Sequence, residues 1–192
     1  MNATALQRWQ TPHDLLAQTE AAFAKLGEAA IKNRQGKAAR EAYILARVGI
    51  LLNADLARLE CHDPPDGLLS FSNIGQVPIE ITELLQEGRQ RGNENDSDLR
   101  IQHQDELDAA VNNNERWLSE RIDAKLRDAA KYPQGTILVV YHNTSLYNFD
   151  SKRTTAELER ASQNAGGNIV AVLIFYEGRL YGKDAMRMLG AA

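Results

Sequence analysis

Two acidic residues in the segment 64–83 have the types and spacing expected of a site for a divalent cation. Asp66 stands at the head of one short apolar segment, and Glu80 lies within the next one, two residues before Thr82. Alternate side chains of a β-strand point to opposite faces, so Glu80 and Thr82 share one face and the neighbouring apolar residues share the other. Carboxylates held next to each other on a hairpin can bind a hard cation through oxygen, so the segment predicts a metal site with Asp66 and Glu80 as ligands.

Two further charged residues, Glu41 and Lys125, fall on the apolar sides of predicted helices. Glu41 lies three residues before Ile44, at the start of an apolar stripe in a helix predicted over 38–59. Because burying an unpaired carboxylate is costly, Glu41 either serves the site or sits, partly hydrated, in a first turn that the helix dipole favours. Lys125 is in line with the apolar stripe of a helix predicted over 99–131, either continuous or with one break at 112–114. We expect Lys125 either to lean toward the site or to extend from the helix edge to solvent.

The remaining elements predict a sheet that would position these side chains. The runs at 136–142 and 168–176 are continuously apolar, which is typical of strands covered on both faces. The segment 151–167 predicts a helix ended by glycines, and a strand, a helix and a second strand in this order form a parallel βαβ unit. Pro78 indicates that the second hairpin strand lies at an edge or begins late. A short edge strand is expected at Arg179–Tyr181.

The N-terminal part of the chain predicts a helix over 11–33, with Thr11 as its N-cap and Gly36 as the break before the next helix. A length of 192 residues suits one domain with a helical appendage. We therefore expect a helical extension over 1–35 and an α/β domain over 36–192, with a mixed central β-sheet flanked by helices.

The composition is that of an ordinary globular protein, at 43% hydrophobic and 25% charged residues. A formal net charge of −4 gives no sign of non-specific nucleic-acid binding, although a local basic patch stays open. One cysteine permits no internal disulfide, and there is neither a signal-peptide pattern nor an apolar run of about 20 residues that could span a membrane. We expect a cytoplasmic protein without a membrane partner, and a homodimer stays open.

The order of these elements resembles that of the PD-(D/E)XK nuclease superfamily, the fold of many restriction and repair nucleases, over roughly residues 38–176. The residues that carry the resemblance are Glu41, Pro65-Asp66 and Glu80-Ile81-Thr82. The resemblance implies a restriction-endonuclease-like core and a nucleic-acid partner. It also implies that Asp66 and Glu80 hold Mg²⁺ or Mn²⁺, while Glu41 supports the metal or its waters.

The chain departs from that superfamily at Thr82, where the family has a lysine that helps the attacking water and stabilises phosphate charge. Threonine carries no positive charge, so either catalysis is lost or a cation arrives from elsewhere. Lys125 is the first candidate for this role, and Arg89 and Arg91 are second because arginine can clamp phosphate but is a poor base. Two functions stay open: a metal-dependent nuclease, and a catalytically inactive binding or protein-interaction module.

Other kinds of site have weaker support. The run Cys61-His62-Asp63 lacks a second Cys/His cluster that could complete a zinc site. The chain has neither the G-x-S-x-G turn of serine hydrolases nor a P-loop. In the segment 141–149, Tyr141, His142 and Tyr147 could stack on bases, or the segment could be a plain surface loop.

Overall fold

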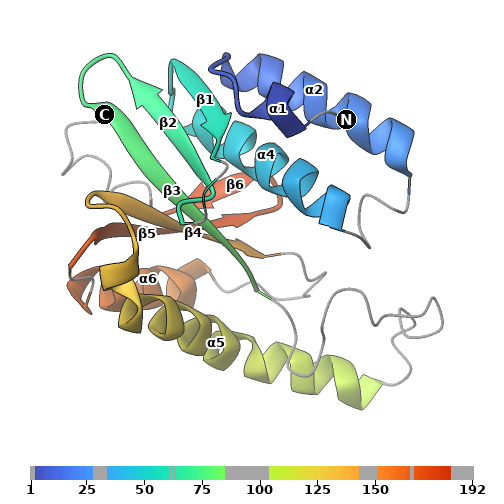
Figure 1. Ribbon diagram of the computed structural model, residues 1–192. Coiled ribbons are helices and arrows are strands. Elements are labelled where there is room, and N and C mark those ends of the chain that lie inside the picture. The colour runs from blue at the N-terminus through green and yellow to red at the C-terminus, as the bar shows by residue number, and fades with distance from the viewer. Residues whose placement is uncertain are drawn as a thin grey trace.

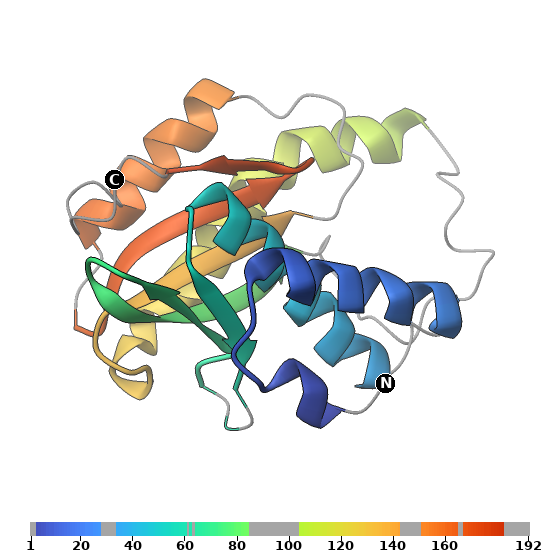
Figure 2. The same cartoon turned by 90° about the horizontal axis from the view of Figure 1, so that it is seen from above.

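The computed structural model describes residues 3–27, 34–60, 62, 64–84, 104–142, 151–164 and 167–182. Within this part of the chain a mixed β-sheet lies between two layers of helices, so the fold is α/β, as predicted (Figures 1 and 2). Its helices do not include one that is both long and apolar enough to cross a membrane.

The strands of the described part are β1 (Leu56–Leu59), β2 (Gly67–Phe71), β3 (Gly75–Leu84), β4 (Thr136–His142), β5 (Ile169–Tyr176) and β6 (Arg179–Tyr181). They follow one another across the sheet in this order. The pairs from β1 to β3 are antiparallel, the pairs from β3 to β5 are parallel, and β6 is antiparallel to β5. The predicted hairpin, parallel βαβ unit and final edge strand are confirmed.

The helices of the described part are α1 (Ala3–Leu6), α2 (Pro12–Leu26), α4 (Arg34–Leu51), α5 (Gln104–Arg127) and α6 (Ser151–Asn164), with a 3₁₀ turn, η2 (Ala129–Lys131). Helices α2 and α4 cover one face of the sheet, and α5 and α6 cover the other (Figure 1). Each face carries its own hydrophobic core, because successive residues of a strand point to opposite sides. In β4, Ile137 and Val139 pack on the α4 side, whereas Leu138 and Val140 pack on the α5 and α6 side.

The N-terminal helices share the core of the α4 side. Leu6 and Leu15 are fully buried in the same cluster as Leu45 of α4 and Leu69 of β2. Helix α2 begins as predicted, since the backbone N–H of Asp14 donates to the side chain of Thr11.

Two predicted helix limits in the first quarter of the chain are wrong. Helix α2 ends at Leu26, where Gly27 adopts a positive φ of 53°, and Gly36 lies inside α4 instead of breaking the chain. One glycine near a helix start costs only about 1 kcal/mol, which the buried face of α4 can offset. Residues 28–33 are outside the described part.

The second helix also stops earlier than predicted, and the segment that follows it is a strand. Helix α4 ends at Leu51, and Asn53 takes the left-handed conformation with φ 56°. Leu59, which continues the apolar stripe of α4 in the sequence, belongs to β1. In the same way, the helix predicted to reach residue 131 ends at Arg127 and is followed by η2.

Strand β3 changes partners in its middle. It pairs with β2 from Gly75 to Ile79 and with β4 from Ile79 to Leu84. Pro78 lies just before the pairing with β4 begins, where its missing N–H interrupts no ladder on that side. The prediction that this part of the strand is an edge is therefore correct locally, although β3 is central in the sheet.

Candidate functional site

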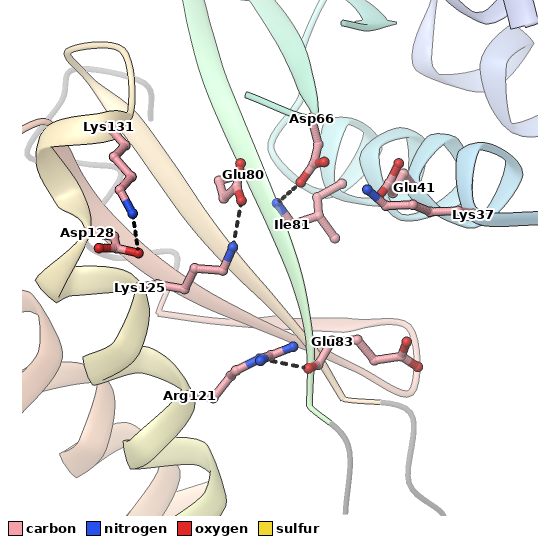
Figure 3. Close-up of polar contacts among 10 residues, drawn as sticks. All are labelled: Lys37, Glu41, Asp66, Glu80, Ile81, Glu83, Arg121, Lys125, Asp128 and Lys131. Atoms are coloured by element: carbon pink, nitrogen blue, oxygen red, sulfur yellow. Dashed lines mark hydrogen bonds and ion pairs between the residues drawn. The ribbon is translucent and has the colours of Figure 1, made fainter. Parts of the chain in front are cut away.

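A fork opens where β2 and β3 separate, and Asp66 lies in it. Beyond Ile79 the backbone of β3 has no further β2 partner. The N–H of Ile81 donates to Oδ2 of Asp66 at 2.7 Å, so a side chain takes the place of the missing strand (Figure 3). The hydrogen bond fixes this buried carboxylate beside the β3 backbone, one residue away from Glu80.

Gly67, the residue after Asp66, packs closely against α4 and β1. A Cβ atom at residue 67 would lie 2.5 Å from Cδ2 of Leu45 and 3.0 Å from the carbonyl oxygen of Arg58. A larger residue here would force Leu45 to shift and would lie tightly against the backbone of β1, because real Cβ atoms do not approach neighbours at 2.5 Å. The residue after Asp66 is thus fixed by packing.

Glu80 and Lys125 form an ion pair across the α5 face of the sheet. Nζ of Lys125 lies 2.8 Å from Oε1 of Glu80, and the two side chains are 27% and 5% exposed (Figure 3). Burial lowers the pKa of Lys125, but the hydrogen bond and the charge of Glu80 outweigh it, so the net pKa is raised. Lys125 is therefore a stable ammonium at neutral pH and a poor general base.

Tyr132, just after η2, supports the same ammonium. Its ring centroid lies 5.8 Å from Nζ of Lys125, within the range of a cation–π contact. Burial raises the pKa of Tyr132, so its phenol stays neutral at physiological pH. The predicted stripe of α5 is confirmed, since Leu118 and Ile122 are buried in the core that also holds Tyr132.

The predicted residues line one cleft of about 340 Å³ between α4, β3 and α5. Its described lining is Lys37, Arg40, Glu41, Ile44, Asp66, Glu80, Ile81, Thr82, Glu83, Arg121, Lys125 and Tyr141. The structure thus brings together the five side chains singled out in the sequence: Glu41, Asp66, Glu80, Thr82 and Lys125. Thr82 is only 4% exposed, and Glu41 pairs with Lys37 at 3.2 Å.

Three cationic residues of the cleft escaped the sequence analysis. Lys37 and Arg40 lie on the α4 wall, and Arg121 lies on the α5 wall, where its Nε donates to the carbonyl oxygen of Glu83 at 3.2 Å. For Arg121 the sequence held a usable signal: it precedes Lys125 by four residues, and residues four apart share a helix face. The described lining residues therefore include four basic and four acidic side chains, which balance formally.

The aromatic candidates of β4 differ in their positions. His142 is buried on the opposite side of β4 from Tyr141, edge-on to Tyr176 at a centroid distance of 4.9 Å. It cannot stack on a ligand in the cleft, whereas Tyr141 lines it.

The remaining candidates, Arg89, Arg91, Tyr147, Cys61 and Asp63, fall outside the described residues. Among the residues that are described, no group of three or more His, Cys, Asp or Glu side chains is placed to hold a metal ion. The three carboxylates singled out in the sequence thus share a cleft without forming a three-ligand cluster.

Comparison of the chain with protein-family models, curated proteins and solved structures finds no match.

Proposed function

We propose that this protein is a metal-dependent nuclease that hydrolyses phosphodiester bonds on a restriction-endonuclease-like core. The observation that carries the proposal is the position of Lys125, whose ammonium lies 2.8 Å from Glu80 in the cleft that also holds Asp66. A positive charge thus stands beside Glu80 although Thr82 cannot supply one. The charge comes from α5 instead of from β3.

The donor set suits a hard divalent cation. Asp66 and Glu80 present carboxylates to the same cleft. Mg²⁺ needs no dedicated cage of protein ligands, because it keeps several waters and takes one or two carboxylates together with substrate phosphates. When bound, Mg²⁺ or Mn²⁺ would lower the pKa of a coordinated water and polarise a phosphoryl oxygen.

The chain's own residues have separate tasks in this proposal. Asp66 is held by the N–H of Ile81, so its carboxylate needs no reorientation when substrate arrives. Lys125 stabilises the negative charge that develops on the phosphoryl oxygens, which requires the ammonium form that the structure favours. Arg40 and Arg121, on opposite walls, bind the phosphates that flank the reacting one.

A second function, a binding module without catalysis, also has an observation in its favour. Lys125 already neutralises Glu80, and the described residues contain no three-ligand metal cluster. A cleft with arginine on two walls could hold an anionic segment of nucleic acid or protein without cutting it.

A cleavage assay separates the two functions. Single- and double-stranded DNA and RNA are incubated with Mn²⁺ or Mg²⁺, with a chelator as one control. Glu80→Gln should abolish cutting, whereas Glu83→Gln, a matched change in the same cleft, should retain most of it. Absence of metal-dependent cutting by the wild-type protein, together with nucleic-acid binding, would favour the binding module.

The position of the lysine can be tested by moving it. Lys125→Met should remove cleavage, and the double variant Thr82→Lys/Lys125→Met should restore part of it. The new ammonium would start from the same face of β3 as Glu80 and would enter space that Lys125 vacates. A double variant that folds, binds Mn²⁺ and still fails to cut would refute the assigned role of the ammonium.

A further inference from the structure

We propose that Lys125 is a built-in competitor of divalent cations at Glu80, so that the cleft takes up a cation and an anionic phosphate together and holds either one weakly alone. This inference rests on the proposed function, because it concerns the regulation of the same site.

The competition follows from the geometry of the ion pair. Lys125 reaches Glu80 from α5 at 2.8 Å, and the Glu80 side chain is only 5% exposed. A cation from solvent therefore meets a carboxylate whose charge is already balanced. The competing ammonium is part of the chain, so its effective concentration at Glu80 is high and does not depend on the salt concentration of the solution.

The charge balance of the cleft leads to the coupling. Because the described lining is formally neutral, a divalent cation that enters alone leaves two uncompensated positive charges in a partly buried space. A phosphate diester supplies negative charge, and a Lys125 ammonium displaced from Glu80 can turn to it. Each ligand therefore raises the affinity for the other, and by linkage the two effects are equal.

The test is a calorimetric titration of Mn²⁺ into the full chain, without and with a saturating deoxydinucleotide. Lys125→Met should bind Mn²⁺ about tenfold or more tightly than the wild type, because a unit charge next to the ligand is removed. Lys37→Met is the matched control. It removes the same charge from the same cleft, but at a side chain that is 56% exposed and well screened, and it should change the affinity little.

The dinucleotide arm tests the coupling directly. In the wild type the dinucleotide should raise the affinity for Mn²⁺, and this gain should shrink in Lys125→Met. Lys125→Gln, which keeps a hydrogen-bond donor near Glu80, gives a second neutral variant in case Lys125→Met does not fold.

Equal affinity for Mn²⁺ in the wild type and in both Lys125 variants would overturn the inference. The same result would follow if Lys37→Met raised the affinity for Mn²⁺ as much as Lys125→Met does. Cleavage of nucleic acid by the wild type with no change in Mn²⁺ affinity would refute the competition and leave the nuclease proposal standing. Tighter Mn²⁺ binding in the variants, with no cleavage by the wild type, would support the competition and refute the nuclease.

Discussion

Removal of the Lys125 ammonium should destabilise the fold, and the size of the effect follows from the burial of its partner. Lys125→Met removes the ammonium that lies 2.8 Å from the Glu80 carboxylate, whose side chain is only 5% exposed. Breaking a fully buried pair in this way costs about 3–5 kcal/mol, whereas exposed pairs are worth about 0–1 kcal/mol. Since Lys125 is itself 27% exposed, we expect a loss of about 2–3 kcal/mol in the free energy of unfolding.

The double variant Glu80→Gln/Lys125→Met separates the contribution of charge to stability from the contribution of packing. It leaves no buried charge behind, so it should be about 1–2 kcal/mol more stable than Lys125→Met alone. The assay is urea unfolding followed by tryptophan fluorescence, for which the buried Trp117 of α5 is a suitable reporter. Lys131→Met is the control, because the pair of Lys131 with Asp128 is exposed on both sides and its loss should not change stability measurably.

An unchanged free energy of unfolding in Lys125→Met would refute this reasoning, since it would mean that Glu80 is hydrated without its partner. A double variant as unstable as Lys125→Met would also count against it, because the loss would then come from packing and not from charge.

Three further outcomes follow from the same contacts. Asp66→Ala should cost about 1–3 kcal/mol by leaving the N–H of Ile81 unsatisfied, whereas Asp66→Asn keeps an acceptor oxygen and should cost less, as chemical denaturation will show. Gly67→Ala should cost about 1–3 kcal/mol or more, because the new Cβ would meet Leu45. Thermal melting curves will measure this loss beside those of Gly75→Ala, in which the new Cβ meets no neighbour and only the positive φ is strained. The raised pKa of Lys125 means that the ion pair contributes its full stability below the usual lysine pKa of 10.5 and loses it as pH rises through the raised pKa. The free energy of unfolding in urea should therefore decline at alkaline pH, and it should decline less in Lys125→Met.

The sequence was most informative where one periodicity held over a whole element. The continuous apolar runs of β4 and β5 predicted buried parallel strands, and the stripe of α5 placed Lys125 in line with the residues that face the sheet. Strand β1 was missed because its four residues continue the apolar spacing of α4. The only local sign of the boundary was the polar pair Asn53 and Asp55, and Asn53 is indeed the residue with positive φ.

Contacts between elements could not be predicted in this way. The hydrogen bond from Ile81 to Asp66 depends on where β2 leaves β3, which no local pattern encodes. Likewise, Lys125 meets Glu80 across 45 residues of sequence, so the sequence could predict the face of the helix but not the partner.

The exchange of partners along β3 has a consequence for the order of folding. Among the described residues, Ile79 is the point at which β3 passes from β2 to β4. Strands β1, β2 and β3 form from contacts that are close in sequence, whereas the pairing of β3 with β4 closes a long loop and should be slower. Asp66 and Glu80 lie in or beside these locally paired strands, whereas Lys125 lies within the long loop that the pairing of β3 with β4 closes, so the cleft needs contacts of both kinds.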